Sequence, residues 1–231
     1  MPVTPPHPHW TDEPLDQRNV VELVHDHLRS EPLEGALVID ATAGNGHDTL
    51  FLAERVGDSG RVLAIDVQPA AIEATRLRLQ AHGVCGRCDL RLGDHKGLAE
   101  LCPTEWRGRV HAAVFNLGYL PGFLPGGERV VLTEARASVA AASAALGLLA
   151  PGGLLVLAIY TGHADGAKEA EALHRWALKQ AARDVPRVSI RHIRDRGSGA
   201  EGRPEVLIMR RASRTPGPPA SPGPAPPERA G

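Results

Sequence analysis

Residues 36–48 read ALVIDATAGNGHD, and this short stretch decides the fold class. Its apolar half is typical of a strand buried on both faces in a parallel sheet. The second half carries Gly44 and Gly46, which permit a tight turn and the close approach of backbone to a ligand. A helix is predicted over 47–56, with its N-terminus directed at whatever the turn binds. A strand, a glycine-rich turn and a helix in this order predict an open α/β sheet.

The same alternation of strand and helix continues on both sides of this unit. An amphipathic helix is expected over 15–29. Further strands and helices are expected in turn at 61–68, 69–83, 88–95, 110–120, 133–153, 154–162 and 166–184. Residues 185–195 and 204–211 are expected to close the sheet as an antiparallel pair. The prediction is a mostly parallel, seven-stranded sheet with helices on both faces, whose ligands bind at the carboxyl ends of the strands.

The chain has 231 residues, enough for one domain with tails, and a formal net charge of -1. This balance excludes a protein that coats nucleic acid by bulk charge, and we expect no DNA partner. No apolar run reaches the length of a membrane span and no signal peptide is evident, so a cytoplasmic location and no membrane partner are expected. The expected organisation is a flexible tail rich in Pro and His (1–14), one folded domain (15–211) and a disordered Pro-rich tail (212–231).

The three cysteines favour a reducing compartment over a disulfide framework. Cys85, Cys88, His95 and Cys102 have zinc-like spacing, but small thiols in apolar surroundings more often serve packing. A His-x-His pair at 7–9 lies in a segment without a core and is more often inert. No metal site is therefore expected.

The glycine-rich turn and the following strand ends carry the groups of a cofactor site. Asp66 ends the second strand twenty residues after Gly46, where a carboxylate can bridge two ribose hydroxyls. A dinucleotide fingerprint needs Gly or Ala where Thr49 stands, which disfavours NAD and leaves other adenosine-containing cofactors. Asp94 and His95 follow the third strand, where an adenine ring would lie. The alternatives are a structural turn with a surface aspartate, and a histidine packed in the core.

The fourth strand ends in AVFNLGY, residues 113–119, and this loop indicates the chemistry. It resembles the Asn-Pro-Pro-Tyr type loop of S-adenosylmethionine-dependent amino methyltransferases. An amine must direct its lone pair along the sulfonium–methyl bond, and an asparagine oxygen with the next backbone carbonyl can accept the amine hydrogens. Asn116 and Tyr119 are therefore the candidate catalytic residues, with the tyrosine ring packing on the substrate base. The alternative is a capping asparagine followed by a core tyrosine.

Four segments together resemble the YtqB/MnmM-type family of RNA methylases, and the resemblance runs from about Asp16 to Arg210. They are DATAGNGHDTLFLAERVG (40–57), AIDVQ (64–68), AAVFNLGYLPG (112–122) and IYTGHADG (159–166). The resemblance implies a Rossmann-like class I methyltransferase fold, S-adenosylmethionine (SAM) as cofactor, and methylation of the aminomethyl group on the wobble uridine of tRNA. The chain departs from the family's pattern in a longer loop, Leu120–Glu128, on the substrate side.

Both halves of the site can be listed on this basis. The candidate cofactor-binding residues are Asp40, Gly44, Asn45, Gly46, His47, Asp48, Asp66, Gln68, Asp94, His95 and Asn116. The candidate substrate-binding residues are Leu117, Gly118, Tyr119, Tyr160, His163, Arg191 and Arg194. Tyr160 is equally compatible with a core position.

A localised basic region is the candidate surface for RNA. Nine arginines and four acidic residues fall between Arg183 and Arg214. Arg191 and Arg194 are the candidates for phosphate contacts to an anticodon loop, whose unstacked bases can enter a pocket at low cost. The alternative is a solvated strand edge protected by charge.

Three functions stay open from the sequence. The first is a tRNA wobble-uridine N-methyltransferase, and the second is a methyltransferase for another RNA or a small-molecule amine. The third is a catalytically silent module that binds a nucleotide or RNA, which would have no need of an amine-orienting Asn116. A homodimer is neither predicted nor excluded.

Overall fold

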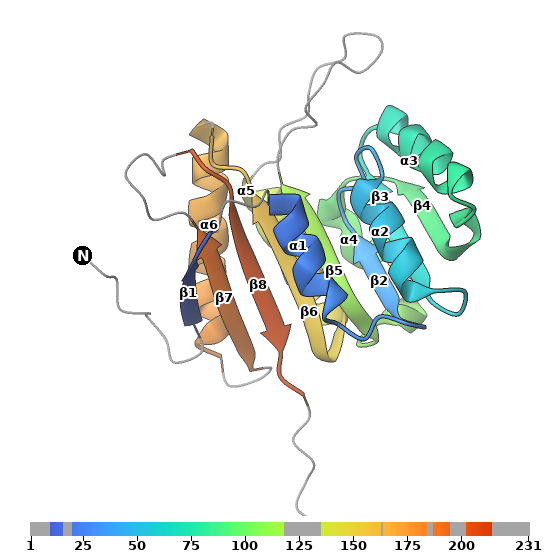
Figure 1. The fold of residues 1–231 in the computed structure, drawn as a ribbon. Coiled ribbons are helices and arrows are strands. Elements are labelled where there is room, and N and C mark those ends of the chain that lie inside the picture. The colour runs from blue at the N-terminus through green and yellow to red at the C-terminus, as the bar shows by residue number, and fades with distance from the viewer. Residues whose placement is uncertain are drawn as a thin grey trace, which may run out of the picture.

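The structure is a computed structural model that describes residues 10–15, 20–117, 135–162, 164–183, 187–194 and 202–213 (Figure 1). Three candidate site residues, Gly118, Tyr119 and His163, lie outside the described residues. The long substrate-side loop and most of both expected tails also lie outside them.

The described strands form one eight-stranded sheet in the order β1-β7-β8-β6-β5-β2-β3-β4 (Figure 1). Their bounds are β1 Trp10–Pro14, β2 Leu37–Asp40, β3 Arg61–Asp66, β4 Cys88–Leu92, β5 Val110–Leu117, β6 Leu149–Ile159, β7 Val188–Arg194 and β8 Glu205–Arg211. β8 runs antiparallel to β6 and to β7, and the other neighbouring pairs are parallel. The mostly parallel sheet with an antiparallel C-terminal pair is thus confirmed.

Helices cover both faces of the sheet, as the alternating sequence predicts (Figure 1). Their bounds are α1 Val20–Arg29, α2 His47–Val56, α3 Pro69–Ala81, α4 Leu98–Leu101, α5 Ala135–Leu148 and α6 Ala164–Ala181, with short 3₁₀ turns η1 Cys85–Arg87, η2 His95–Gly97 and η3 Thr104–Trp106. Residues of α1, α2 and α3 share one apolar core with the sheet, and residues of α4, α5 and α6 share the other. No described helix has the length and apolarity that a membrane span requires.

The two cores follow from the alternation of side chains along each strand. In β5, Phe115 and Leu117 lie in the core under α5 and α6, whereas Val114 lies in the core under α1 and α2. Asn116 is two residues from Val114, so its side chain points to the same face of the sheet, toward α1 and α2. Tyr160, directly after β6, is two residues from Ala158 and lies on the same face. The strand period therefore places both polar side chains on one face, just past the apolar core.

The sequence-based expectation is wrong at the N-terminal edge of the sheet. Residues 10–14, expected to belong to a flexible tail, form the eighth strand β1 beside β7, and the described helix α1 begins at Val20 instead of residue 15. β1 is a polar edge strand, so it lacks the apolar alternation by which strands are recognised. Its stability comes from β7, because Asp12 and Glu13 form ion pairs with Arg194 and Arg191 of that strand.

The helix expected over 133–153 ends earlier than predicted. α5 stops at Leu148, and Leu149 already pairs with Val110 of β5. A residue that precedes proline avoids the helical conformation, and Pro151 follows closely. The Pro-Gly-Gly stretch lies within β6, at the point where the register between β5 and β6 shifts. Gly152 has a φ of 84° there.

Candidate active site

The candidate site lies at the carboxyl ends of β2, β3, β4 and β5. β2 is flanked by β3 on one side and by β5 on the other. The chain therefore adds β3 and β4 on one side of β2, then returns and continues the sheet on the other side with β5. Open α/β sheets bind their ligands at such a switch point. The topology therefore brings the glycine-rich turn, Asp66, His95 and Asn116 to the same edge of the sheet.

The glycine-rich turn depends on both of its glycines. Gly44 and Gly46 adopt φ values of 53° and 78°, in the left-handed region that other residues avoid. A Cβ atom on Gly46 would lie 2.8 Å from the Cα atom of Thr75 in α3. The Thr75 hydroxyl donates a hydrogen bond of 3.1 Å to the Gly44 carbonyl. The turn is thus held directly against α3, with no room for a side chain at Gly46.

Asp66, predicted to bind ribose, also orders the turn. Its two carboxylate oxygens accept hydrogen bonds of 2.9 Å from the backbone N–H groups of Gly44 and Gln68. A carboxylate has about four acceptor positions, so both oxygens retain capacity for ligand hydroxyls. Val67, which the sequence analysis did not single out, is 45% exposed beside it. An exposed apolar side chain next to this carboxylate offers a surface for a purine ring.

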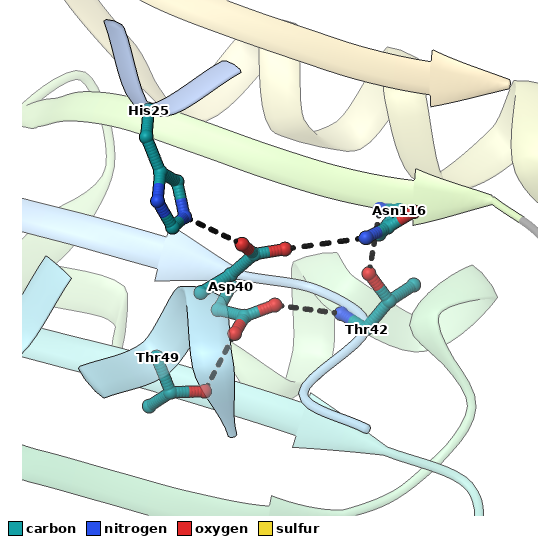
Figure 2. Close-up of polar contacts among 6 residues, drawn as sticks. His25, Asp40, Thr42, Thr49 and Asn116 are labelled. Carbon is teal, nitrogen blue, oxygen red and sulfur yellow. Dashed lines mark hydrogen bonds and ion pairs between the residues drawn. The ribbon is translucent and has the colours of Figure 1, made fainter. Parts of the chain in front are cut away.

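Asp40, predicted as a cofactor ligand, ends β2 and bonds to the turn. It has no exposed surface, and it accepts hydrogen bonds from the Thr42 N–H (3.1 Å) and the Thr49 hydroxyl (2.5 Å). Burial, and then repulsion from the Asp48 carboxylate, raise the pKa of Asp40 to about 7. Figure 2 shows Asp40 joined to both threonines beneath the turn. Asp40 is therefore a positioning residue.

Asp48 connects three elements at the base of the site. Its Oδ1 lies 2.8 Å from Nε2 of His25 in α1, and its Oδ2 accepts a 3.4 Å hydrogen bond from Nδ2 of Asn116 in β5. The His25 ring stacks on Phe51 at a centroid distance of 4.0 Å. The two oxygens of this carboxylate thus contact side chains from α1 and from β5. Sequence reasoning missed His25, because a histidine within an amphipathic helix carries no motif signal.

Asn116 is fixed through both its backbone and its side chain. Its N–H donates to the Thr42 hydroxyl at 2.7 Å, which joins the end of β5 to the glycine-rich turn. Its side chain shares a hydrogen bond with the Tyr160 phenol, whose pKa is raised mainly by burial. Because Asp48 accepts from the amide nitrogen, the amide oxygen is directed away from Asp48. The carbonyl of Leu117 accepts a 3.2 Å bond from the Tyr160 N–H and keeps a second lone pair.

Asp94 and His95 lie after β4, as predicted. The Asp94 carboxylate accepts from the Lys96 N–H and pairs with the Lys96 ammonium, both at 2.9 Å. His95 packs edge-on against Phe115, with ring centroids 6.2 Å apart. Burial lowers the pKa of His95, so its ring is neutral at physiological pH. Its Nε2 is buried and has no hydrogen-bond partner within the described part of the chain.

Asn45, His47 and Gln68 form the rim of the turn. Asn45 and His47 are exposed, and the Arg78 guanidinium bonds to the Asn45 carbonyl (2.6 Å) and to His47 Nε2 (3.1 Å). Partial burial, together with that guanidinium, lowers the pKa of His47. Gln68 is half-buried and precedes α3, which begins at Pro69.

Arg191 and Arg194, the predicted phosphate contacts, lie on β7 and are separated from β5 by two strands. The Arg191 guanidinium forms two hydrogen bonds of 2.8 and 2.7 Å with the Glu13 carboxylate. Arg194 lies 3.6 Å from Asp12. Their side chains are nevertheless 46% and 39% exposed. The N-terminal strand therefore supplies acidic partners that compete with any phosphate for these arginines.

The residues at the sheet edge fit an adenosine-containing cofactor. The turn has glycines at two positions of positive φ, Asp66 retains acceptor capacity, and Val67 offers an apolar surface. His95 Nε2 is a buried polar atom without a partner in the described residues. A bound adenosine could satisfy each of these features at once.

Comparison with known proteins agrees with this geometry. A protein from Arabidopsis thaliana named "tRNA (mnm(5)s(2)U34)-methyltransferase, chloroplastic" is 36% identical over 165 residues, which are 68% of this chain and 58% of that protein. The chain thus spans less than two thirds of the plant relative. A solved "putative rRNA-methylase" from Clostridium thermocellum has 32% identity and a TM-score of 0.72, and the match covers 85% of this chain and 100% of that one.

A second solved structure, a "putative methyltransferase" from Streptococcus mutans in complex with SAH, has 27% identity and a TM-score of 0.69 over 85% of this chain and 99% of that one. The family model described as "Putative rRNA methylase" matches residues 62–198, which is more than half of the chain. The match includes Asp66, His95 and Asn116 and extends through β7. The chain therefore belongs to the family described as "Putative rRNA methylase".

Proposed function

We propose that the protein is a SAM-dependent N-methyltransferase that methylates the aminomethyl group on the modified wobble uridine of tRNA. The observation that carries the proposal is the placement of Asn116 at the end of β5, with its amide nitrogen donating to Asp48 and its backbone joined to the glycine-rich turn. This arrangement holds an amide oxygen beside the cofactor site, where it can accept a hydrogen from an amine. A silent nucleotide-binding module would have no use for such an oxygen.

The cofactor half of the proposal uses the groups at the ends of β2, β3 and β4. Asp66 is assigned to the ribose hydroxyls, Val67 and His95 to the adenine, and the turn at Gly44 and Gly46 to the amino-acid end. The relative from Streptococcus mutans, solved with SAH (S-adenosylhomocysteine), supports this assignment. When bound, SAM supplies a methyl group on a positively charged sulfur.

The acceptor half of the proposal concerns direction more than acid–base chemistry. Bound SAM would supply the methyl group to the amine nitrogen, and the amine would release one proton to water. The Asn116 oxygen and the Leu117 carbonyl accept amine hydrogens and so direct the lone pair at the methyl carbon. Positioning of this kind can contribute several kcal/mol, about 7–11 at its upper limit, without a nucleophilic side chain.

The tRNA substrate is supported by the name of the plant relative and by the amine-orienting Asn116. A second candidate substrate is ribosomal RNA, because the family description and the Clostridium thermocellum relative both name it. Tyr119 and Gly118 are assigned to the substrate base only from their positions after Asn116. Tyr160 is placed beside Asn116 and is assigned to the same pocket.

Mass spectrometry of RNA nucleosides from cells that lack the gene tests the proposal directly. Aminomethyl-uridine should accumulate in tRNA, and adding the purified protein with SAM should convert it to the methylated nucleoside. If tRNA is unchanged and a methylated nucleoside is missing from ribosomal RNA, the second candidate is correct. If both RNA fractions match those of the parent cells, the RNA substrate is wrong.

A further inference from the structure

A second polar cluster lies on the other face of the sheet and takes no part in the proposed reaction. It consists of His174 in α6, His192 in β7 and Glu205 at the start of β8. His174 Nε2 lies 2.7 Å from Glu205 Oε1, and His192 Nε2 lies 2.9 Å from Glu205 Oε2. The three ligand atoms all lie within 4.8 Å of one another.

The cluster is buried to an unusual degree for charged groups. The side chains of His192, Glu205 and His174 are 3%, 8% and 26% exposed. Residues with these side chains are seldom buried unless they are paired or bind a metal. His174 Nε2 and Glu205 Oε1 are both buried and lie 2.7 Å apart. Ligand atoms held this close together can bind one ion in common.

The surroundings of His192 match those of a metal-binding histidine. Asp12 is paired with His192 in the register of β1 and β7, and its Oδ1 lies 3.0 Å from His192 Nδ1. Carboxylates beside metal-binding histidines orient the ring in this way, and Nε2 of His192 lies on the side of Glu205, 2.9 Å from its Oε2. Arg194 lies 3.6 Å from the other oxygen of Asp12. Apart from the two imidazoles, the two carboxylates and the one guanidinium leave one net negative charge, which favours a divalent cation.

We propose that His174, His192 and Glu205 bind a divalent cation of the zinc type, with Asp12 orienting His192. Two imidazole nitrogens and one carboxylate oxygen suit zinc, whereas magnesium and calcium prefer oxygen ligands throughout. The fourth position is taken by water. The ligands come from α6, β7 and β8, so the ion joins this helix to the C-terminal strand pair and, through Asp12, to β1.

The proposed ion is separate from the methyl-transfer site. Glu205 pairs with Ile159 of β6, the residue before Tyr160, so the two sites are neighbours along the sheet edge. They lie on opposite faces of the sheet, however. The alternation of side chains places His192 and Glu205 on the face covered by α6, whereas Asn116 and Tyr160 lie on the face covered by α1. The ion's role is to fix the C-terminal part of the sheet rather than to activate a substrate.

Metal titration of the full chain tests the proposal. After treatment with a chelator, the protein should bind one equivalent of Zn²⁺, measured by competition with a chromophoric chelator. Co²⁺ in its place should give visible absorption bands typical of four-coordinate nitrogen and oxygen ligation. Zn²⁺ should also raise the Tm. Failure of the wild-type protein to bind Zn²⁺ or to give these Co²⁺ bands would overturn the proposal.

Matched variants locate the ion. His174→Ala and Glu205→Gln should each weaken Zn²⁺ binding by at least about tenfold and remove the rise in Tm, and Asp12→Asn should weaken it by about tenfold through His192. His82→Ala is the control, because His82 is exposed and far from the cluster in sequence, and it should bind like wild type. If the cluster variants bind Zn²⁺ as tightly as wild type, the site is wrong. Thiolate-to-cobalt bands, or loss of binding when His7 and His9 are replaced, would place the ion elsewhere and also overturn it.

Discussion

Replacing Asp40 by Asn tests the electrostatics beneath the glycine-rich turn. The substitution exchanges a carboxylate with no exposed surface for a neutral side chain of the same shape. The Asn oxygen can still accept from the Thr42 N–H. The Thr49 hydroxyl, which now donates to the carboxylate, can rotate and accept from the new amide. The substitution thus removes a charge while leaving the hydrogen-bonded positions filled.

The expected effect follows from the raised pKa of Asp40, about 7 in the folded protein against 3.8 for the ordinary side chain. Between these values the folded protein keeps a proton that the unfolded chain has released. The wild-type protein therefore loses stability as the pH rises from about 4 to about 7. Each pKa unit corresponds to ~1.4 kcal/mol, so the loss reaches at most about 4 kcal/mol at neutral pH and above. Asp40→Asn avoids this loss and should be the more stable protein above neutrality.

Urea unfolding of both proteins between about pH 5 and pH 8 measures the difference. The advantage of the variant should grow with pH and level off above about pH 7. Asp58→Asn is the control, because its side chain is 95% exposed and paired only at the surface, so its effect should stay below about 1 kcal/mol. An Asp40→Asn difference that is constant across this range, or that favours wild type at pH 8, would refute the reasoning.

Three further predictions concern the candidate site and the RNA surface. Gly46→Ala should destabilise the protein by more than about 2 kcal/mol, measured by urea unfolding, and should abolish SAM binding, measured by calorimetry. Gly83→Ala is the control, because Gly83 has a similar φ but lies in open space; it should cost about 1 kcal/mol of stability and leave SAM binding intact. Asn116→Ala should lower single-turnover methylation by about 10²–10³-fold while SAM affinity changes little, and equal losses in both would contradict its role. Arg191→Glu should raise the KM for RNA, and Glu13→Gln should lower it by freeing the arginine; an unchanged KM in both would leave the pair purely structural.

The site could be located from sequence because its groups follow strands of a parallel sheet. In such a sheet the carboxyl ends lie together whatever the details of packing, so Asp66 and Asn116 needed only a correct assignment of strands. The same reasoning did not reveal that Asp40, which ends a strand like the others, has no exposed surface. Whether a side chain at a strand end points outward or beneath the turn depends on tertiary packing, which a motif does not encode.

Contacts between distant polar residues could not be predicted, and β1 shows why. Glu13 and Arg191 are 178 residues apart, and nothing in either local sequence indicates the other. Their contact depends on the register of β1 against β7, in which Asp12 pairs with His192. Because side chains alternate, this register sends Asp12 to the face of His192 and Glu13 to the face of Arg191. A shift of one residue would exchange the two carboxylates. Glu13 would then lie beside the histidines, and the shorter Asp12 would lie beside Arg191. A strand that looked like part of a tail thus sets both how available Arg191 is to RNA and which carboxylate supports the proposed metal site.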